Sequence, residues 1–216
     1  MRNKEKITVE ISPRNLEDFI WMSYRYCIGR KTIAAASHAC TIAELIFKNP
    51  NLLSEDRKEF MAQDIRQSVL DTLKWNQRIR ILNQYNNVNW DFYALLLEGM
   101  SECPYPNEAV FVIDFENHKL TWERREYQNC IDKPDDMYDD LIGWVKLANA
   151  LDKTCHKDIV VNVNGKEHIE RCFPYVARTQ GEYKLVWASL NKDAGSRIDQ
   201  QGYIIPELIT EIKDIE

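Results

Sequence analysis

The sequence predicts an α+β fold in which an N-terminal helical layer packs against a mostly antiparallel β-sheet. Apolar residues recur at helical spacing before Pro104, whereas short continuous or alternating apolar runs dominate after it. Among these runs, Asn164-Gly165 is the preferred two-residue turn of a β-hairpin. We therefore expect residues 1–103 to be mainly helical and residues 104–216 to be mainly β with one or two helices, the two regions sharing one core.

The helical layer is expected to span about residues 15–100, after a short strand at residues 7–11 that joins the sheet. Asn15 is the expected N-cap of the first helix, and Gly29 is its expected end because glycine accepts the left-handed conformation. The alanines of a second helix, about residues 32–47, allow close packing. The apolar stripe of the first helix consists of Leu16, Phe19, Ile20, Tyr24 and either Cys27 or Ile28.

A long third helix is predicted from Ser54, its N-cap, to roughly Leu82, and a shorter one over residues 90–100. The buried stripe of the long helix is expected to contain Phe60, Met61, Ile65, Val69, Leu73 and Leu82. The charged residues of its other face are interpreted as solvated, and they are Arg57, Lys58, Asp64, Arg66, Lys74, Arg78 and Arg80.

Strand signals follow in the second half. AVFVIDF and LTWER flank the turn ENHK and predict a hairpin, and further strands surround Asn164-Gly165 and include EYKLVWASL. Residues 132–140 are acidic and are interpreted as a loop that caps a helix ending near Asp152, since they lack the glycine and spaced ligands of a calcium loop. The last segment is expected to be a helix or strand, and Pro206 disfavours a central strand there.

Composition limits the function classes. The 216-residue chain has a net charge of −6, which argues against bulk nucleic-acid binding, since that needs a broad basic surface. No apolar run reaches membrane-spanning length and the N-terminal residues do not resemble a signal peptide, so we expect a cytoplasmic protein. The six cysteines form no CxxC pair, so reduced thiols are expected and neither a metal nor a cofactor is predicted.

Residues 24–38, YRYCIGRKTIAAASH, contain the candidate binding site. Arg30 and Lys31 stand at the positive start of the second helix, where a bound anion would explain them, and Arg25 lies five residues upstream. The alternative is that Arg25 and Arg30 pair with Glu17, Asp18 or Glu44 and hold two helices together. The predicted ligand-binding residues are Tyr24, Arg25, Tyr26, Arg30, Lys31, Thr32 and His38, with the tyrosines able to stack on a base.

Signatures of known catalytic sites are missing. The sequence contains no Walker loop, Rossmann glycine pattern, HExxH or GxSxG motif. His38 is interpreted as a hydrogen-bonded core histidine, with a general base beside the anion as the sharper alternative. Cys27 and His38 would form a nucleophile and base only if the fold brought them together, which their spacing does not require.

Residues 21–38, WMSYRYCIGRKTIAAASH, resemble a YRYxIGRxT-like segment of uncharacterised small phage and prophage proteins of Gram-positive bacteria. The resemblance implies an accessory binding protein, in the host cytoplasm, that engages a host defence factor or an anionic nucleotide-like ligand without catalysis. The alternative is a small enzyme that acts on a phosphorylated or nucleotide substrate through Arg25, Arg30 and His38. A homo-oligomer is left open.

Overall fold

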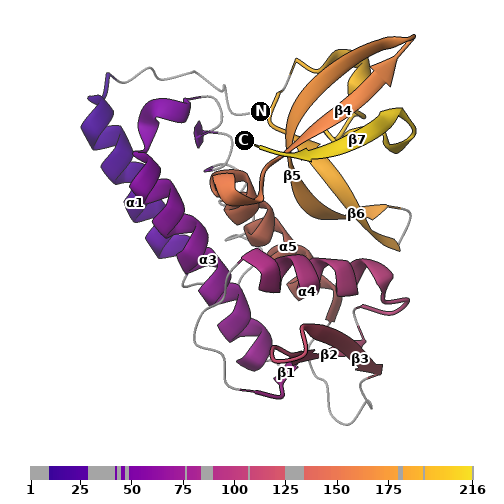
Figure 1. Cartoon of the computed structure of the whole chain (residues 1–216). Helices are drawn as coiled ribbons and strands as arrows, with labels where there is room; N and C mark the ends of the chain where they lie inside the picture. The colour runs from indigo at the N-terminus through magenta and orange to yellow at the C-terminus, as the bar shows by residue number, and fades with distance from the viewer. Residues whose placement is uncertain are drawn as a thin grey trace, which may run out of the picture.

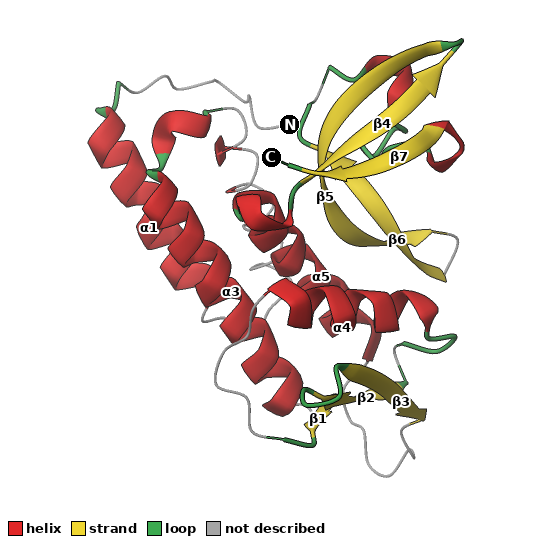
Figure 2. Cartoon of the chain, viewed as in Figure 1, coloured by secondary structure: helices red, strands yellow, loops and turns green. Residues whose placement is uncertain are grey.

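The computed structural model has an α+β fold, as the sequence predicts, in which helices pack with two separate sheets (Figures 1 and 2). The structure describes residues 10–28, 42, 45–46, 49–75, 77–83, 90–106, 108–124, 134–179, 182–191 and 193–215. Short 3₁₀ turns connect some of the longer elements, and they are η1 (Pro50–Leu52), η2 (Lys153–Cys155), η3 (Gly195–Arg197) and η4 (Pro206–Leu208).

Helix α1 (Pro13–Ile28) begins earlier than predicted. The side-chain oxygen of Ser12 accepts a hydrogen bond from the Asn15 amide at 3.2 Å, so Ser12 is the N-cap and Asn15 lies inside the helix. Proline suits the first helical position because its missing N–H has no partner there in any case. Ile20 and Tyr24 are buried as expected, but Phe19 is 61% exposed, so its assignment to the buried stripe was wrong.

Two predicted N-terminal elements lie largely outside the described residues. Of the strand expected at residues 7–11, only the last two residues are described, and they form no strand. Gly29 and the alanines of the expected second helix are not among the described residues. Ile42, Leu45 and Ile46 are helical, and Ile42 and Ile46 are buried.

Helix α3 (Glu55–Trp75) ends seven residues before the predicted Leu82. Gln77 adopts a positive φ of 55°, its amide bonds to the Lys74 carbonyl at 3.0 Å, and the Arg78 amide bonds to the Leu73 carbonyl at 2.9 Å. This pair of bonds is the Schellman motif that terminates helices. The chain then enters strand β1 (Ile79–Ile81), which explains why Leu82 is exposed rather than buried in a helix.

The first sheet has the order β1-β2-β3. Strands β2 (Ala109–Asp114) and β3 (Lys119–Arg124) form the predicted antiparallel hairpin, and β1 pairs with β2 in parallel. The second sheet contains β4 (Lys157–Val163), β5 (Lys166–Thr179), β6 (Glu182–Ser189) and β7 (Ile209–Asp214) in the antiparallel order β6-β5-β4-β7. The single sheet of the prediction is therefore two sheets.

The predicted hairpin turn between β4 and β5 is confirmed. Asn164 and Gly165 both adopt positive φ, at 53° and 81°, which is the conformation that a type I′ turn requires. The final segment is a strand, β7, and Pro206 lies before it in η4, as its effect on strands predicts.

Helices α4 (Trp90–Glu102) and α5 (Pro134–Leu151) connect the layers. Helix α4 contacts β3 of one sheet and β6 of the other, and α5 lies between α3 and β5 (Figure 1). Residues 134–140 of the acidic segment predicted as a loop at residues 132–140 belong to α5 and are helix instead. The largest apolar cluster contains side chains from α1, α3, α4, α5, β2 and β5, so residues on both sides of Pro104 contribute to it.

Candidate functional site

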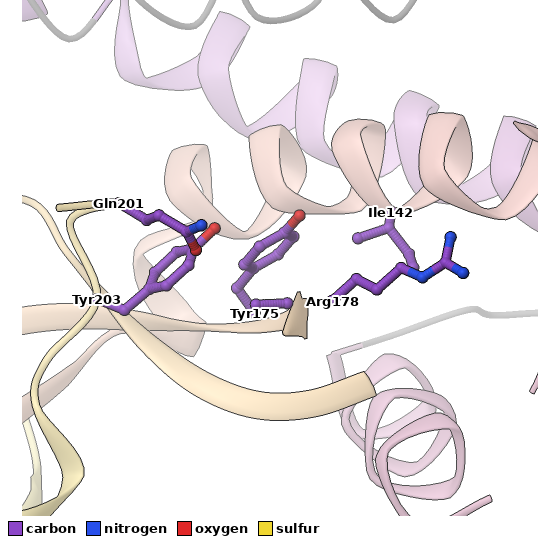
Figure 3. A pocket seen from close by; sticks show the side chains of 6 residues that line it. Ile142, Tyr175, Arg178, Gln201 and Tyr203 are labelled. Atoms are coloured by element: carbon purple, nitrogen blue, oxygen red, sulfur yellow. The ribbon is translucent and has the colours of Figure 1, made fainter. Parts of the chain in front are cut away.

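A cleft between α5 and β5 is the strongest candidate for a binding site. It contains two adjoining cavities, of about 270 and 350 Å³, that share Gln201. The smaller cavity is drawn in Figure 3 and is lined by Ile142, Tyr175, Ala177, Arg178, Gln201 and Tyr203. The larger one is lined by Lys146, Phe173, residues 188–191 and residues 198–202.

Lys146 lines the larger cavity and contacts two tyrosines that line the smaller one. Its ammonium nitrogen is 4.5 Å from the ring centre of Tyr175 and 4.8 Å from that of Tyr203. The same nitrogen donates a hydrogen bond to the Tyr203 hydroxyl at 3.2 Å. An ammonium group over aromatic faces is attracted by the ring quadrupole. The cleft thus places a cation of the larger cavity against two aromatic rings of the smaller one.

Local secondary structure explains why these side chains converge. Ile142 and Lys146 are one turn apart on α5, so they share the face that looks toward the sheet. Phe173, Tyr175 and Ala177 alternate along β5 and share one side of that strand. In Figure 3 the Tyr175 ring rises from the strand toward α5, and Arg178 extends past Ile142 at the end of the cavity away from Gln201.

Backbone hydrogen bonds hold Tyr203 in place. A carboxylate oxygen of Asp199 accepts from the amides of Gln201 and Tyr203, each at 2.9 Å, and the Asp199 amide donates to the Tyr203 carbonyl at 2.8 Å. Gly202 within this turn has a positive φ of 87°, which glycine adopts without strain. Burial, followed by the charge of Asp199, raises the pKa of Tyr203, so its hydroxyl is neutral at physiological pH and accepts the bond from Lys146.

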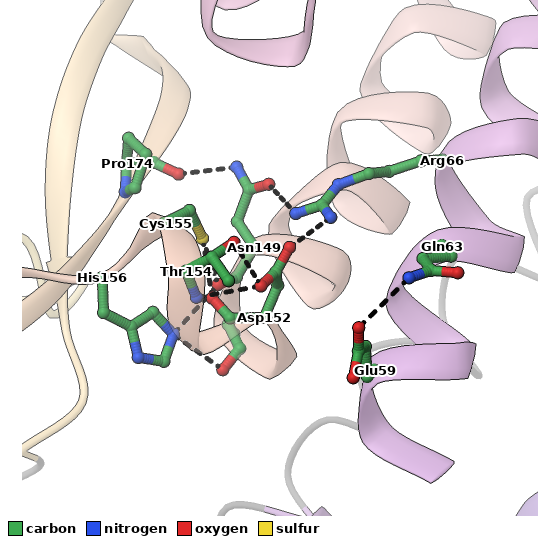
Figure 4. A network of polar contacts seen from close by, with 10 residues as sticks. Glu59, Gln63, Arg66, Asn149, Asp152, Thr154, Cys155, His156 and Pro174 are labelled. Carbon is green, nitrogen blue, oxygen red and sulfur yellow. Dashed lines mark hydrogen bonds and ion pairs between the residues drawn. The ribbon is translucent and has the colours of Figure 1, made fainter. Parts of the chain in front are cut away.

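A second polar cluster on the same helix is buried in the scaffold (Figure 4). Arg66 of α3 forms an ion pair with Asp152 and donates to the side chain of Asn149 at 3.4 Å, and Asn149 donates to the Pro174 carbonyl at 2.8 Å. The three bonds join α3, α5 and β5. Arg66 is only 3% exposed, so its assignment to a solvated face was wrong, and Arg78 is equally buried.

The Asp152 carboxylate is stabilised in its charged form. Burial by itself would raise the pKa of Asp152, but hydrogen bonds from Thr154 and Arg66 and the charge of Arg66 outweigh it and lower the pKa below its ordinary value. The Thr154 amide and hydroxyl donate to one oxygen of Asp152 at 2.9 and 2.7 Å. Asp152 is therefore both the partner of a buried arginine and the cap of η2.

Cys155 and His156 complete the end of α5. The Cys155 thiol donates to the Asn149 carbonyl at 3.0 Å, and the Nε2 atom of His156 lies 3.1 and 3.2 Å from the carbonyls of Asn149 and Ala150. Burial raises the pKa of Cys155 to about 12 and lowers the pKa of His156. A neutral thiol and a neutral imidazole that both bond helix carbonyls act as caps, since α5 leaves those carbonyls without helical partners.

The sequence-predicted site is only partly described. The Tyr24 hydroxyl donates to Asp64 at 2.7 Å and Arg25 donates to the same oxygen at 2.9 Å, while the Arg25 side chain is 49% exposed. Burial and the contact with Asp64 raise the pKa of Tyr24 far above its ordinary value. The side chain of Tyr26 and all of Arg30, Lys31, Thr32 and His38 lie outside the described residues.

The ion pair of Arg25 differs from the alternative that the sequence suggested. Its partner is Asp64 of α3, and the carboxylates of Glu17 and Asp18 lie 3.2 and 3.5 Å from Arg57 instead. These contacts join α1 to α3. Glu44, the third suggested partner, is not among the described residues.

Sequence reasoning did not find the cleft. Lys146, Tyr175 and Tyr203 come from three separate segments that share no motif. One local signal was present in the sequence. Lys146 is the single charged residue in LIGWVKLANAL, a stretch whose other residues are mainly of the types found in protein cores. A cation on an apolar helix face requires a local partner or an opening to solvent.

Comparison with protein-family models, curated proteins and solved structures gives no match for this chain. The resemblance of residues 21–38 to phage proteins therefore stays a prediction. Within the described ranges, no group of three or more histidine, cysteine, aspartate or glutamate side chains is arranged to hold a metal ion. None of the helices that the structure describes is long and apolar enough to cross a lipid bilayer.

Proposed function

We propose that this protein binds an anionic, nucleotide-like ligand in the cleft between α5 and β5, without catalysis. The observation that carries the proposal is the position of the Lys146 ammonium group, which belongs to the lining of the larger cavity and lies against the rings of Tyr175 and Tyr203 in the smaller one. Aromatic rings stack on bases, and cationic side chains bind phosphate through charge-assisted hydrogen bonds. A nucleotide contains both partners in one molecule.

The dimensions and the distribution of polar groups support this ligand class. Each cavity alone, at about 270 or 350 Å³, is close to the lower end of the usual ~300–1,000 Å³ range of small-molecule sites, and the two together fall well within that range. Arg178 adds a guanidinium group at one end of the smaller cavity and Gln201 adds an amide at the other. A phosphate bound near Lys146 or Arg178 leaves the tyrosine rings for a base and Gln201 for a hydrogen bond to its edge.

Binding without turnover is supported by the roles of the nearest reactive groups. His156 is 6.3 Å from the ring of Phe173, which lines the larger cavity, but its Nε2 atom bonds helix carbonyls. The Cys155 thiol bonds two carbonyls and is protonated at neutral pH. Neither group is arranged as a nucleophile or a general base for a ligand in the cleft. With the resemblance to phage proteins, this favours a protein that sequesters a nucleotide signal of the host.

The test is a binding screen by calorimetry against nucleoside monophosphates, cyclic nucleotides, cyclic dinucleotides and inorganic phosphate. Replacement of Lys146→Gln is expected to weaken the best ligand about ten-fold or more, because one charge-assisted contact is lost. Lys153→Gln is the matched control, since Lys153 pairs with Glu55 at the surface and is 71% exposed. The Lys153→Gln variant should bind the ligand with the same affinity as the wild type.

Three results would reject the proposal. The first is that no ligand of the screen binds, and the second is that both lysine variants bind as well as the wild type. The third is phosphorus NMR evidence that the bound ligand is converted to product, which would support the alternative of a small enzyme.

A further inference from the structure

Strand β7 forms one edge of the four-stranded sheet. It pairs with β4 on its inner side, and no backbone hydrogen bond joins its outer side to another described residue. Its last four residues are all exposed, and Ile212 is 49% exposed although it lies in register with the fully buried Ile159. An exposed edge of this length is a template for a further strand.

The opposite edge of the sheet is already covered. The Leu185 amide of β6 donates to the Ser101 hydroxyl of α4 at 3.0 Å, and the Ser189 amide donates to the Gly202 carbonyl at 3.0 Å. Between them, the Trp187 carbonyl accepts from the Ile204 amide at 2.8 Å. The backbone groups of β6 that point away from β5, at residues 185, 187 and 189, therefore have hydrogen-bond partners within the chain. Among the described residues, β7 is thus the edge that stays open, and a sheet with one open edge favours a closed pair of molecules over an open filament.

The side chains of β7 are complementary to a second copy of the same strand. Glu211 and Lys213 share one face of the strand and form an ion pair with each other at 2.9 Å, while Ile212 points to the other face. We propose that β7 pairs antiparallel with β7 of a second copy, with Ile212 opposite the partner's Ile212. In this register Glu211 lies opposite the partner's Lys213 on both sides of the two-fold axis.

Charge selects this register over its neighbours. A shift by one pairing step in one direction places Glu211 opposite the partner's Glu211, and a shift in the other direction places Lys213 opposite the partner's Lys213. Like charges directly opposite on antiparallel strands are destabilising, and opposite charges are stabilising. The same charges that protect the edge against unrelated strands thus fit one arrangement with a copy of itself. The four-stranded sheets of the two copies then form one continuous sheet across the two-fold axis.

The interface is small, so we expect a weak dimer whose mass depends on protein concentration. Sedimentation velocity over a series of concentrations measures this directly. The wild type is expected to move from monomer to dimer as concentration rises. Glu211→Lys and Lys213→Glu should each weaken self-association about ten-fold or more, because both symmetry-related pairs change from attraction to repulsion.

A mixture of the two variants tests the register. The Glu211→Lys chain has two positive charges on this face and the Lys213→Glu chain has two negative charges, so an equimolar mixture should form dimers as well as the wild type does. Glu182→Lys is the matched control, because Glu182 pairs with Lys184 on β6 in the same way, at 3.3 Å, but on the covered edge. It should dimerise normally, and circular dichroism checks that every variant is folded.

The proposal is overturned if the wild type stays monomeric at its highest soluble concentration. It is equally overturned if the single variants dimerise as the wild type does, or if the mixture fails to recover the dimer. A higher oligomer that Glu182→Lys disrupts would place the contact on β6 instead.

Discussion

Two polar clusters lie along α5, and they differ in what their charged groups face. Arg66 is 3% exposed, and its guanidinium group forms an ion pair with Asp152 and a hydrogen bond with Asn149. Lys146 faces two tyrosine rings and lines a cavity of about 350 Å³. Both cations lie over tyrosine rings, so a positive charge beside an aromatic side chain does not distinguish them. The difference lies in whether the space beyond the cation is filled by protein.

The ion pair of Arg25 and Asp64 adds a third case. Its arginine is half exposed, and water screens its charge. Such a pair joins α1 to α3 but contributes little to the stability of the fold. Loss of the pair between Arg66 and Asp152 costs more stability, because bulk water cannot solvate the buried arginine in place of its partner. Burial therefore predicts which cation supports the fold, and Lys146 differs from the two arginines in that it lines a cavity.

The largest effect is expected from Asp152→Ala. This change leaves the buried Arg66 without its carboxylate, and loss of one partner of a buried ion pair typically costs about 3–5 kcal/mol of stability. Arg25→Ala is the control, with an expected loss below about 1 kcal/mol for an exposed pair. Urea denaturation gives both free energies of unfolding. Equal losses for the two variants would show that burial does not separate these clusters.

A smaller effect, on binding and not on folding, is expected from Tyr175→Leu. A base stacked on an aromatic side chain contributes about 1–3 kcal/mol, so loss of the ring should weaken ligand binding about ten-fold. Tyr175→Phe keeps the ring and is expected to bind normally. The ligand is the best one from the calorimetric screen. If phenylalanine and leucine weaken binding equally, the hydroxyl and not the ring makes the contact, and the stacking role assigned to Tyr175 is wrong.

The smallest effect is expected from protonation of His156, which makes the stability of the protein depend on pH. Burial lowers its pKa in the folded state, so the unfolded chain binds a proton first as the pH falls below the ordinary histidine value of about 6.5. The unfolded state then binds more protons, and stability should decrease from pH 7 toward pH 5. In His156→Gln that decrease should become shallower, as measured by urea denaturation at each pH. An unchanged slope would mean that His156 is not buried in its neutral form.

Local sequence signals predicted the elements whose cause is local. Asn164-Gly165 predicted its hairpin because the turn needs two left-handed residues, and the strands AVFVIDF and LTWER were found from their residue types and spacing. The end of α3 was missed because Gln77, and not a glycine, adopts the left-handed conformation there. Ser12 was missed as a cap because Asn15 offered the same chemistry three residues later.

By itself, the sequence determined the α+β class, most of the described helices and strands, and the hairpin turn, because each depends on residues close together in the chain. Only the tertiary structure decided that Arg66 is buried, that Arg25 pairs with Asp64, and that two sheets form instead of one. It also brought Lys146 and Tyr175 together with Tyr203, 57 residues from the lysine. Contacts between residues so far apart in the chain depend on how whole helices and strands pack together. Hydrophobic periodicity predicts that one face of an element is buried, but it does not predict which other element covers that face.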